Sequence, residues 1–341
     1  MSASAAATGP AADDSARGSQ PIAGTSRWLD IGGPVHFLDF GGPRRGPVIV
    51  CVHGLAGAAV NWSAIAPLLT GRCRVLAPDL AGHGLTRSAG RATDVQANTR
   101  LLDRFIEHVS DTPVILMGNS MGGMISLLEA RAAEDRVSGL VLIDPALPFV
   151  PARPDLLVAT VFVAGGLPGL GSALLRGVHM LPPAAIIARI LSLCCQDPSR
   201  VPADIVAQHV ETERQRAGFA EAGHDIGVAT RSVITTAGFG GHAYRAAIAS
   251  LSCPVLVIHG EQDRLVPASA ARAAARTHPS WSLVIVPDVG HVPQLEAPQE
   301  CADAIVSWLD AGGRPAARGA TTAAPTLAGL SNRRWRVRRG R

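Results

Sequence analysis

The sequence predicts an α/β protein with a mostly parallel, eight-stranded sheet, helices on both faces and a helical segment inserted near its middle. Three observations support this prediction. Short, fully apolar runs alternate with helix-like segments, which is typical of parallel strands covered on both sides. A Gly-x-Ser-x-Gly turn joins one apolar run directly to a helix-like run. A proline-rich stretch then interrupts the alternation, which resumes at residue 254.

The first two predicted strands form a hairpin. Residues 28–31 and 35–40 are mainly apolar, and the turn Gly32-Gly33-Pro34 separates them. A connection this short joins antiparallel strands.

The parallel part of the sheet follows the hairpin. The helix at 94–109 carries Leu101, Leu102, Phe105, Ile106 and Val109 at three-to-four spacing, which indicates one buried face. Alternation of apolar runs with such helices indicates βαβ units. The remaining strands are expected at 48–52, 74–77, 113–117, 139–143, 254–260 and 282–286, and the other helices at 62–69, 124–130, 268–277 and 298–310.

The proline cluster at 144–151 marks a domain boundary. The segment behind it is mostly helix-like and follows the carboxyl end of a strand, where open parallel sheets bind ligands. We therefore interpret it as a lid. The expected division is a core of 25–147 and 251–310, a helical cap of 148–250, and disordered tails of 1–24 and 311–341.

The charge of the chain is concentrated at its end. The formal net charge is +4, but residues 311–341 contribute +8 and residues 1–24 contribute −1, which leaves −3 for the body. No nucleic-acid partner is therefore expected. The arginine-rich tail is expected to be solvated, with contact to anionic lipid or nucleic acid as the alternative. The first residues lack the basic and apolar stretches of a signal peptide, so a cytoplasmic location is expected.

One stretch of the lid is long enough for a membrane span. Leu156–Leu175 holds twenty residues without a charge. Its glycines and prolines, and its place in the middle of an α/β pattern, favour apolar lid helices instead. Weak contact of the cap with a membrane surface stays open as a further alternative.

Residues 113–122 predict a nucleophile. Five apolar residues lead into the pentapeptide Gly118-Asn-Ser-Met-Gly122, and a helix-like run follows. This arrangement is typical of a nucleophile elbow, in which strained dihedrals lift the Oγ of Ser120 clear of the sheet. Glycines are expected on both sides because a Cβ would collide with nearby backbone. A phosphate-binding turn is the alternative, but such a loop favours a lysine and the chain contains none.

A serine nucleophile needs a base and an orienting acid. His291 lies on a glycine-containing loop just past the last predicted strand, and Asp263 lies on the loop after the strand before it. A carboxylate at Asp263 can hold the imidazole in the required tautomer. Alternatives stay open: a solvent-facing His291, a helix-capping Asp263, and Glu261 or Asp144 as the acid.

Two backbone N–H groups are expected to form an oxyanion hole. Met121 lies at the start of the helix after Ser120, where the helix dipole also favours negative charge. Leu55 lies on the loop after the strand 48–52. The predicted donors are therefore the N–H groups of Leu55 and Met121.

These motifs together resemble the α/β-hydrolase superfamily, specifically its lidded branch of esterases, epoxide hydrolases and carbon–carbon bond hydrolases. The resemblance covers residues 28–310 and implies the α/β-hydrolase fold with a helical cap. Its matching segments are His53-Gly54 with Gly57, Asp79–Gly84, Gly118–Gly123, Gly260–Asp263 and Gly290-His291.

The resemblance limits the reactions that the chain is expected to catalyse. Epoxide hydrolases and haloalkane dehalogenases of this superfamily use aspartate as nucleophile, and Ser120 argues against both. The elbow is similar to that of hydrolases acting on ring-cleavage products of aromatics. Those relatives usually carry Gly-Pro-Gly after the His-Gly pair, whereas this chain has Leu55-Ala56-Gly57.

We expect a serine hydrolase that cleaves carboxylic esters of small lipophilic molecules through an acyl-enzyme intermediate. Ser120 is the nucleophile, His291 the base and Asp263 the acid, and neither a metal nor an organic cofactor is expected. Apolar residues at 156–175 and 181–193 of the lid favour a lipophilic substrate. Predicted substrate contacts are His53, Gly54, Asn119, Leu147, Val266 and Val292.

Three other functions fit the same motifs. They are carbon–carbon bond hydrolysis of aromatic ring-cleavage products, acyl transfer, and ligand reception by a fold that retains the triad without turnover. The sequence predicts neither the acyl and alcohol parts of the substrate nor the oligomeric state.

Overall fold

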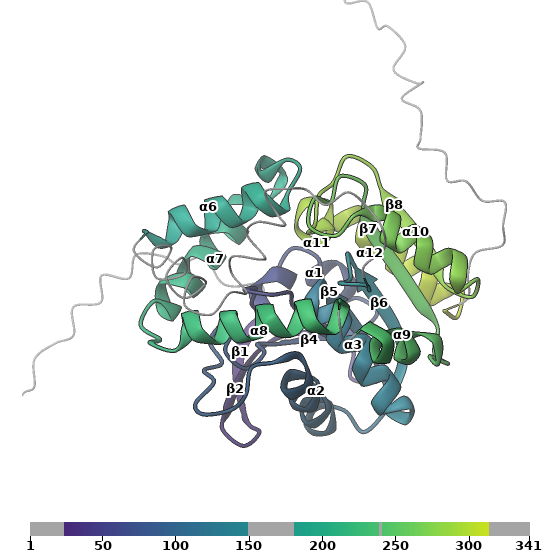
Figure 1. The fold of residues 1–341 in the computed structure, drawn as a ribbon, viewed down its shortest axis with the longest axis horizontal. Helices are drawn as coiled ribbons and strands as arrows, with labels where there is room; N and C mark the ends of the chain where they lie inside the picture. The colour runs from purple at the N-terminus through teal and green to yellow at the C-terminus, as the bar shows by residue number, and fades with distance from the viewer. Residues whose placement is uncertain (1–23, 149–180, 239–240, 314–341) are drawn as a thin grey trace, which may run out of the picture.

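The computed structural model describes residues 24–148, 181–238 and 241–313 (Figure 1). The apolar stretch 156–175 lies outside these residues, as do nearly all of both predicted tails. None of the helices in the described ranges is long and apolar enough to cross a membrane.

One sheet of eight strands forms the centre of the molecule, in the order β1-β2-β4-β3-β5-β6-β7-β8. β1 and β2 pair antiparallel, β2 pairs antiparallel with β4, and the remaining pairs are parallel. The predicted fold class is confirmed. The strands are β1 (Thr25–Asp30), β2 (Pro34–Gly41), β3 (Val48–Val52), β4 (Arg74–Pro78), β5 (Val114–Asn119), β6 (Val137–Ile143), β7 (Val255–Gly260) and β8 (Ser282–Val286).

Helices cover both faces of the sheet. Side chains alternate between the two faces along each strand. Val50 and Val52 of β3 therefore pack on one face, with the helices at 95–109 and 121–132. Ile49 and Cys51 pack on the other face, with the helices at 66–69 and 298–310. The core helices and turns are η1 (Ala59–Trp62), α1 (Ala66–Leu69), α2 (Val95–Val109), α3 (Met121–Ala132), η2 (Glu134–Arg136), α10 (Ala268–Thr277), α11 (Pro293–Glu296) and α12 (Pro298–Asp310).

Two details of the core differ from the sequence prediction. The helix expected at 62–69 is instead a 3-10 turn, η1, followed by the short helix α1. Pro67 has no N–H and its ring excludes a continuous helix through the preceding turn, which explains the break. The short helix α11 directly follows the loop of His291 and had no signal in the sequence.

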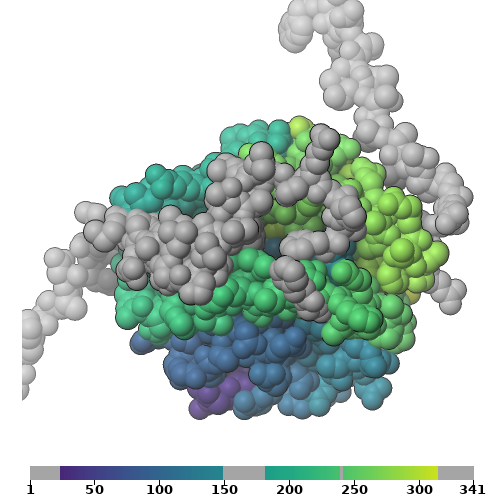
Figure 2. Space-filling model, in the orientation of Figure 1, coloured from purple at the N-terminus to yellow at the C-terminus, as the bar shows by residue number. Residues whose placement is uncertain are grey.

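The part of the insertion between β6 and β7 that the structure describes, residues 181–238 and 241–249, is mainly helical. Helix α8 packs on α2 (Figures 1 and 2), with the N–H of Val95 donating to Oγ of Ser232 at 3.0 Å. Arg216 is buried and donates to the carbonyl oxygen of Gly82 at 2.8 Å. The described helices and turn of this segment are α6 (Pro183–Cys194), η3 (Pro198–Arg200), α7 (Ala203–Arg216), α8 (Ala222–Ala237) and α9 (Gly241–Ala249).

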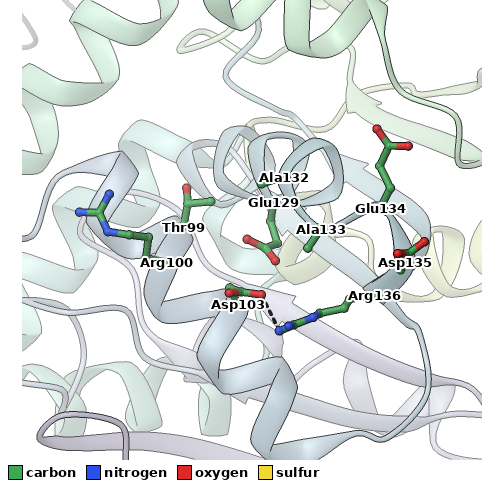
Figure 3. A pocket seen from close by; sticks show the side chains of 9 residues that line it. All are labelled: Thr99, Arg100, Asp103, Glu129, Ala132, Ala133, Glu134, Asp135 and Arg136. Carbon is green, nitrogen blue, oxygen red and sulfur yellow. Dashed lines mark hydrogen bonds and ion pairs between the residues drawn. The ribbon is translucent and has the colours of Figure 1, made fainter.

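A hollow of about 380 Å³ lies between α2, α3 and η2 (Figure 3). Glu129 of α3 points into it near Asp103 of α2 and is only 1% exposed. Burial, followed by the charge of Asp103, raises the pKa of Glu129 to about 8, and Glu107 adds to this while Arg136 opposes it. Glu129 therefore carries a proton in the folded protein at neutral pH.

The raised pKa of Glu129 predicts a stability that depends on pH. The unfolded carboxyl group ionises near its ordinary pKa, whereas the folded one keeps its proton up to about pH 8. The free energy of unfolding of the native protein should therefore fall as pH rises from about 4.5 to 8. Glu129→Gln removes this loss, so the variant should gain roughly 1–3 kcal/mol over the native protein at pH 8 and little at pH 4.5. Urea unfolding at several pH values measures the difference.

The matched control is Glu134→Gln, which makes the same chemical change at an exposed residue of the same hollow. It should shift stability by less than about 0.5 kcal/mol at every pH. A constant gap between Glu129→Gln and the native protein from pH 4.5 to 8 contradicts a protonated Glu129.

Candidate active site

Ser120 lies on a strained bend at the carboxyl edge of the sheet. β5 ends at Asn119 and α3 begins at Met121, so one residue makes the turn. Its φ is 54° and its ψ is −117°, a conformation that residues other than glycine rarely adopt. The N–H of Ser120 donates to the carbonyl of Ile143 at 3.1 Å, and the N–H of Ala146 donates to the carbonyl of Ser120 at 3.0 Å. β6 and the turn after it therefore hold the bend.

The predicted need for glycine around this bend is confirmed. A Cβ at Gly118 would overlap the carbonyl of Gly122, and a Cβ at Gly122 would overlap the carbonyl of Val52. A Cβ at Gly123 would come within 2.8 Å of Pro145. α3 therefore packs against β3 and the turn after β6 with no room for side chains at these positions.

The predicted base and acid lie side by side. Nδ1 of His291 donates to Oδ2 of Asp263 at 2.7 Å, and both side chains are buried. Oδ1 of Asp263 accepts the N–H groups of Leu265 at 2.8 Å and Val266 at 3.0 Å. Burial alone raises the pKa of Asp263, but His291 and the hydrogen bonds hold it well below its usual range. The ionised carboxylate fixes the tautomer of His291 and leaves Nε2 available to accept a proton.

Asn119 connects the bend to the histidine loop. Its Nδ2 donates to the carbonyl oxygens of Ile143 and His291, both at 3.1 Å. The side chain is 2% exposed and both amide hydrogens are used. The sequence predicted that Asn119 contacts a substrate, whereas the structure shows its amide group bound to the backbone carbonyls of β6 and the histidine loop.

The segments that flank Ser120 present two backbone donors. A Cβ at Gly54 would lie 3.2 Å from Cβ of Ser120, so the loop after β3 lies against the predicted nucleophile. Within residues 24–148, 181–238 and 241–313, neither the N–H of Leu55 nor that of Met121 donates to a protein acceptor. Met121 also opens a helix, whose dipole favours a negative charge there. The role of both N–H groups in an oxyanion hole stays a prediction.

His53 was predicted to contact a substrate, but its ring is fully buried. Nδ1 donates to the carbonyl of Gly54 at 2.8 Å, and Nε2 accepts the N–H of Leu80 at 3.1 Å. Burial lowers the pKa of His53, so the ring is neutral near pH 7. Because backbone groups occupy both nitrogens, His53 fixes the loops after β3 and β4 and has no polar atom left for a ligand.

The other three predicted contacts are apolar side chains that are buried or partly buried. Leu147 lies in the same apolar cluster as Met121, and Val266 packs against that cluster. Val292 lies in a separate cluster with Ile187 of α6. Their contact with a substrate stays a prediction.

Among the described residues, one group of three side chains has the spacing of a metal site, and it consists of Asp144, Asp263 and His291. Asp263 already accepts two backbone N–H groups and the N–H of His291. Three donors therefore already use the oxygens of Asp263, which favours the role of base and acid over metal ligation.

The end of α6 lies directly on the loops of the base and the acid. The carbonyl of Cys194 accepts the N–H of His291 at 2.6 Å. Arg264, next to Asp263, donates to the carbonyls of Ser192 at 2.6 Å and Leu193 at 3.1 Å. The last turn of a helix offers unpaired carbonyls, and here both loops use them. The inserted segment therefore helps to hold the base in place.

Glu296 joins the same two segments and had no signal in the sequence. Its Oε2 accepts the N–H groups of Gly290 at 2.9 Å and Gln196 at 3.1 Å, and its Oε1 accepts that of Asp197 at 2.7 Å. The residue is 4% exposed. A buried carboxylate with three backbone donors holds the residue before His291 against the chain that leaves α6.

A family model described as "Alpha/beta hydrolase family" matches residues 49–304. Pimeloyl-[acyl-carrier protein] methyl ester esterase of Aromatoleum aromaticum is 30% identical, over 75% of this chain and 95% of its own length. 2-Hydroxy-6-oxo-6-(2'-aminophenyl)hexa-2,4-dienoic acid hydrolase of Metapseudomonas resinovorans is 27% identical, over 83% of this chain and 90% of its own.

A longer relative is similar over part of its length. The dihydrolipoyllysine-residue acetyltransferase component of the acetoin cleaving system of Pseudomonas putida is 27% identical over 83% of this chain, which spans 66% of that protein. Among solved structures, a putative lipase of Acinetobacter baumannii AYE has a TM-score of 0.68 at 22% identity, covering 85% of this chain and 92% of the lipase. That likeness supports the fold.

The contacts of Glu296 predict its effect on stability. Glu296→Gln places an amide NH₂ where backbone N–H groups now donate, so at least one buried donor loses its acceptor. The free energy of unfolding should fall by roughly 1–3 kcal/mol. Glu300→Gln on α12, where the side chain is exposed, is the matched control and should change it by less than about 0.5 kcal/mol. Equal urea midpoints for the two variants contradict the assigned role of Glu296.

Proposed function

The chain belongs to the alpha/beta hydrolase family, and from the geometry of its site we propose that it is a serine hydrolase of carboxylic esters, acting through an acyl-enzyme intermediate. The observation that carries the proposal is the hydrogen bond of 2.7 Å from His291 to Asp263, at a loop that Asn119 ties to Ser120. These two contacts support a nucleophile, a base and an acid that act together at one edge of the sheet.

The first half of the reaction forms the acyl-enzyme. Oγ of Ser120 attacks the ester carbonyl while Nε2 of His291 takes its proton. The negative oxygen that forms is bound by the N–H groups of Leu55 and Met121. The carbonyl then reforms, the bond to the alkoxide breaks, and His291 returns the proton to the leaving alcohol. Asp263 stabilises the imidazolium throughout.

The second half uses water as the nucleophile. His291 takes a proton from the water, whose oxygen attacks the acyl carbon, and the same two N–H groups bind the second oxyanion. Collapse of this intermediate breaks the bond to Ser120, and the proton passes from His291 to Oγ. The products are a carboxylic acid and an alcohol, and the serine is restored.

A small lipophilic ester is the proposed substrate. The predicted contacts Leu147 and Val292 are buried apolar residues, which supports this choice. Helix α6 of the inserted segment adds the buried apolar residues Ile186, Ile187 and Leu191. The relative from Aromatoleum aromaticum is named as a methyl ester esterase, which supports an ester as the bond cleaved.

A second candidate is carbon–carbon bond hydrolysis, favoured by the 27% identity to the hexadienoic acid hydrolase. The same serine chemistry serves both reactions, but the carbon–carbon substrate carries a carboxylate. A cation is the usual partner of such a group. Because the predicted contacts Leu147, Val266 and Val292 are all apolar, the ester is the better match.

Ser120→Ala tests the nucleophile. Hydrolysis of p-nitrophenyl butyrate should fall by roughly six orders of magnitude, because the hydroxyl is the attacking group. A fluorophosphonate probe should label the native protein and not the variant. Ser138→Ala, at an exposed serine of β6, is the control and should keep both labelling and turnover. Labelling that persists in Ser120→Ala, or native protein that never labels, counts against the proposal, and the latter favours a ligand receptor.

The substrate class predicts a dependence on chain length. In a series of p-nitrophenyl esters, kcat/KM should rise about three- to fourfold for each CH₂ that becomes buried, until the pocket is full. A ring-cleavage dienoate should be turned over far more slowly than the best ester. Preference for acetate over longer chains contradicts a lipophilic pocket, and faster cleavage of the dienoate contradicts the choice of an ester. Competition by an added alcohol against water would instead indicate acyl transfer.

A further inference from the structure

A second buried carboxyl group, that of Asp144, lies beside the proposed acid and takes no part in the mechanism above. Asp144 directly follows β6 and is fully buried. Its φ is +44°, which is uncommon for a residue other than glycine. Its N–H donates to the carbonyl of Ile258 on β7 at 2.9 Å. Contacts with the neighbouring strand therefore hold this carboxyl group in a fixed position.

The two oxygens of Asp144 have different surroundings. Oδ1 accepts the N–H of Gly260 at 3.0 Å and lies 3.3 Å from Nε2 of His259. Oδ2 is buried and accepts no hydrogen bond from any described residue. An ionised Oδ2 would be left without a donor, which is costly in a dry site. A protonated Oδ2 needs an acceptor instead.

The carboxylate of Asp263 lies beside Asp144 and offers such an acceptor. One oxygen of Asp144, one oxygen of Asp263 and a ring nitrogen of His291 all lie within 4.8 Å of one another. Asp263 is the better stabilised anion, because it receives two backbone N–H groups and the N–H of His291. Two carboxylates this close repel each other strongly, so one of them keeps a proton.

The ring of His259 also lies beside the pair and makes its shorter contact with a backbone carbonyl. Its Nε2 donates to the carbonyl of Val266 at 2.9 Å and lies 3.3 Å from Asp144 and 3.4 Å from Asp263. Its Nδ1 is buried and has no partner among the described residues. His259 therefore gives neither carboxyl group a hydrogen bond as short as the one of 2.7 Å that Asp263 receives from His291.

We propose that Asp144 is a positioning residue of this site: its Oδ2 keeps a proton and donates it in a hydrogen bond to Asp263, so that the pair carries a single negative charge. The effect on turnover rests on the proposed function, but the proton itself does not. The protonated carboxyl group of Asp144 donates a hydrogen bond to Asp263. Because Asp144 is then neutral, Asp263 contributes the single negative charge beside His291. A second negative charge would hold the proton on His291 more tightly and slow its return to the leaving group.

The surroundings of the pair agree with a neutral Asp144. Burial raises its pKa well above the ordinary value, the charges of Asp263 and Glu296 raise it further, and the N–H of Gly260 opposes them. Two thiols also face the pair, and burial raises the pKa of Cys194 to about 12 and that of Cys301 well above its ordinary value. Arg264, the nearest cation on the acid loop, donates away from the pair to the end of α6.

The proton can be observed in protein that does not turn over. Ser120→Ala protein is prepared with aspartate carrying ¹³C in its side-chain carboxyl group, and the infrared C=O stretch of protonated carboxyl groups is recorded at pH 7. The isotope separates an aspartate band from the band of Glu129. We expect one labelled band, which disappears in Ser120→Ala/Asp144→Asn and shifts in Ser120→Ala/Asp263→Asn, where an amide replaces the ionised acceptor. A spectrum without the labelled band overturns the proposal, and so does a band that persists in the Asp144→Asn protein.

The active protein gives a second readout. Asp144→Asn stays neutral and can still donate to Asp263, so kcat should remain within about threefold and the acidic limb of the pH profile should not move. Asp144→Ala removes the donor and should lower kcat roughly tenfold at unchanged KM. An acidic limb that moves down by about one pH unit in Asp144→Asn would mean that the native residue is ionised. That shift, or an Asp144→Ala protein with native kcat, overturns the proposal.

The two readouts separate this proposal from the proposed function. A labelled band together with an absence of any ester turnover leaves the proton on Asp144 in place and removes the ester assignment. Ester turnover that depends on Ser120, in a protein without the labelled band, supports the ester assignment and removes the proton from Asp144.

Discussion

The bend at Ser120 is the constraint on which the rest of the site depends. A left-handed backbone at a residue other than glycine costs about 1–3 kcal/mol, and hydrogen bonds to Ile143 and Ala146 hold it in place. Glycines at 118 and 122 are required because the bend brings α3 against β3 with no space for a side chain. The loop of Leu55 lies against the serine, and the N–H of Met121 belongs to the residue that directly follows it.

The base depends on contacts that reach well beyond its own loop. Asn119 binds the carbonyl of His291, the end of α6 binds its N–H, and Glu296 binds the N–H of the residue before it. Strand β5, the inserted segment and helix α11 therefore all bind the backbone of the loop that carries the imidazole. These hydrogen bonds couple the position of α6 to that of the histidine loop.

The sequence predicted the parts that depend on local patterns. Apolar runs and glycine spacing gave the strands, the elbow and the loops of Asp263 and His291, since each follows from neighbouring residues. The prediction of one continuous helix at 62–69 was wrong because Pro67 interrupts it. The roles of His53, Asn119, Asp144 and Glu296 depend on burial and on partners far along the chain. No pattern in a single sequence encodes such contacts. His53 and Asn119 were therefore predicted as substrate contacts, and no role was predicted for Glu296.

Trapping of the acyl-enzyme tests the central claim most directly. Native protein is mixed with a p-nitrophenyl ester, quenched in acid within the first turnover, digested and analysed by mass spectrometry. The account predicts a mass increase of one acyl group, confined to the peptide that contains Ser120 and lost when the quench is delayed until substrate is exhausted. Product formation without any acyl adduct, or an adduct on another residue, would contradict it.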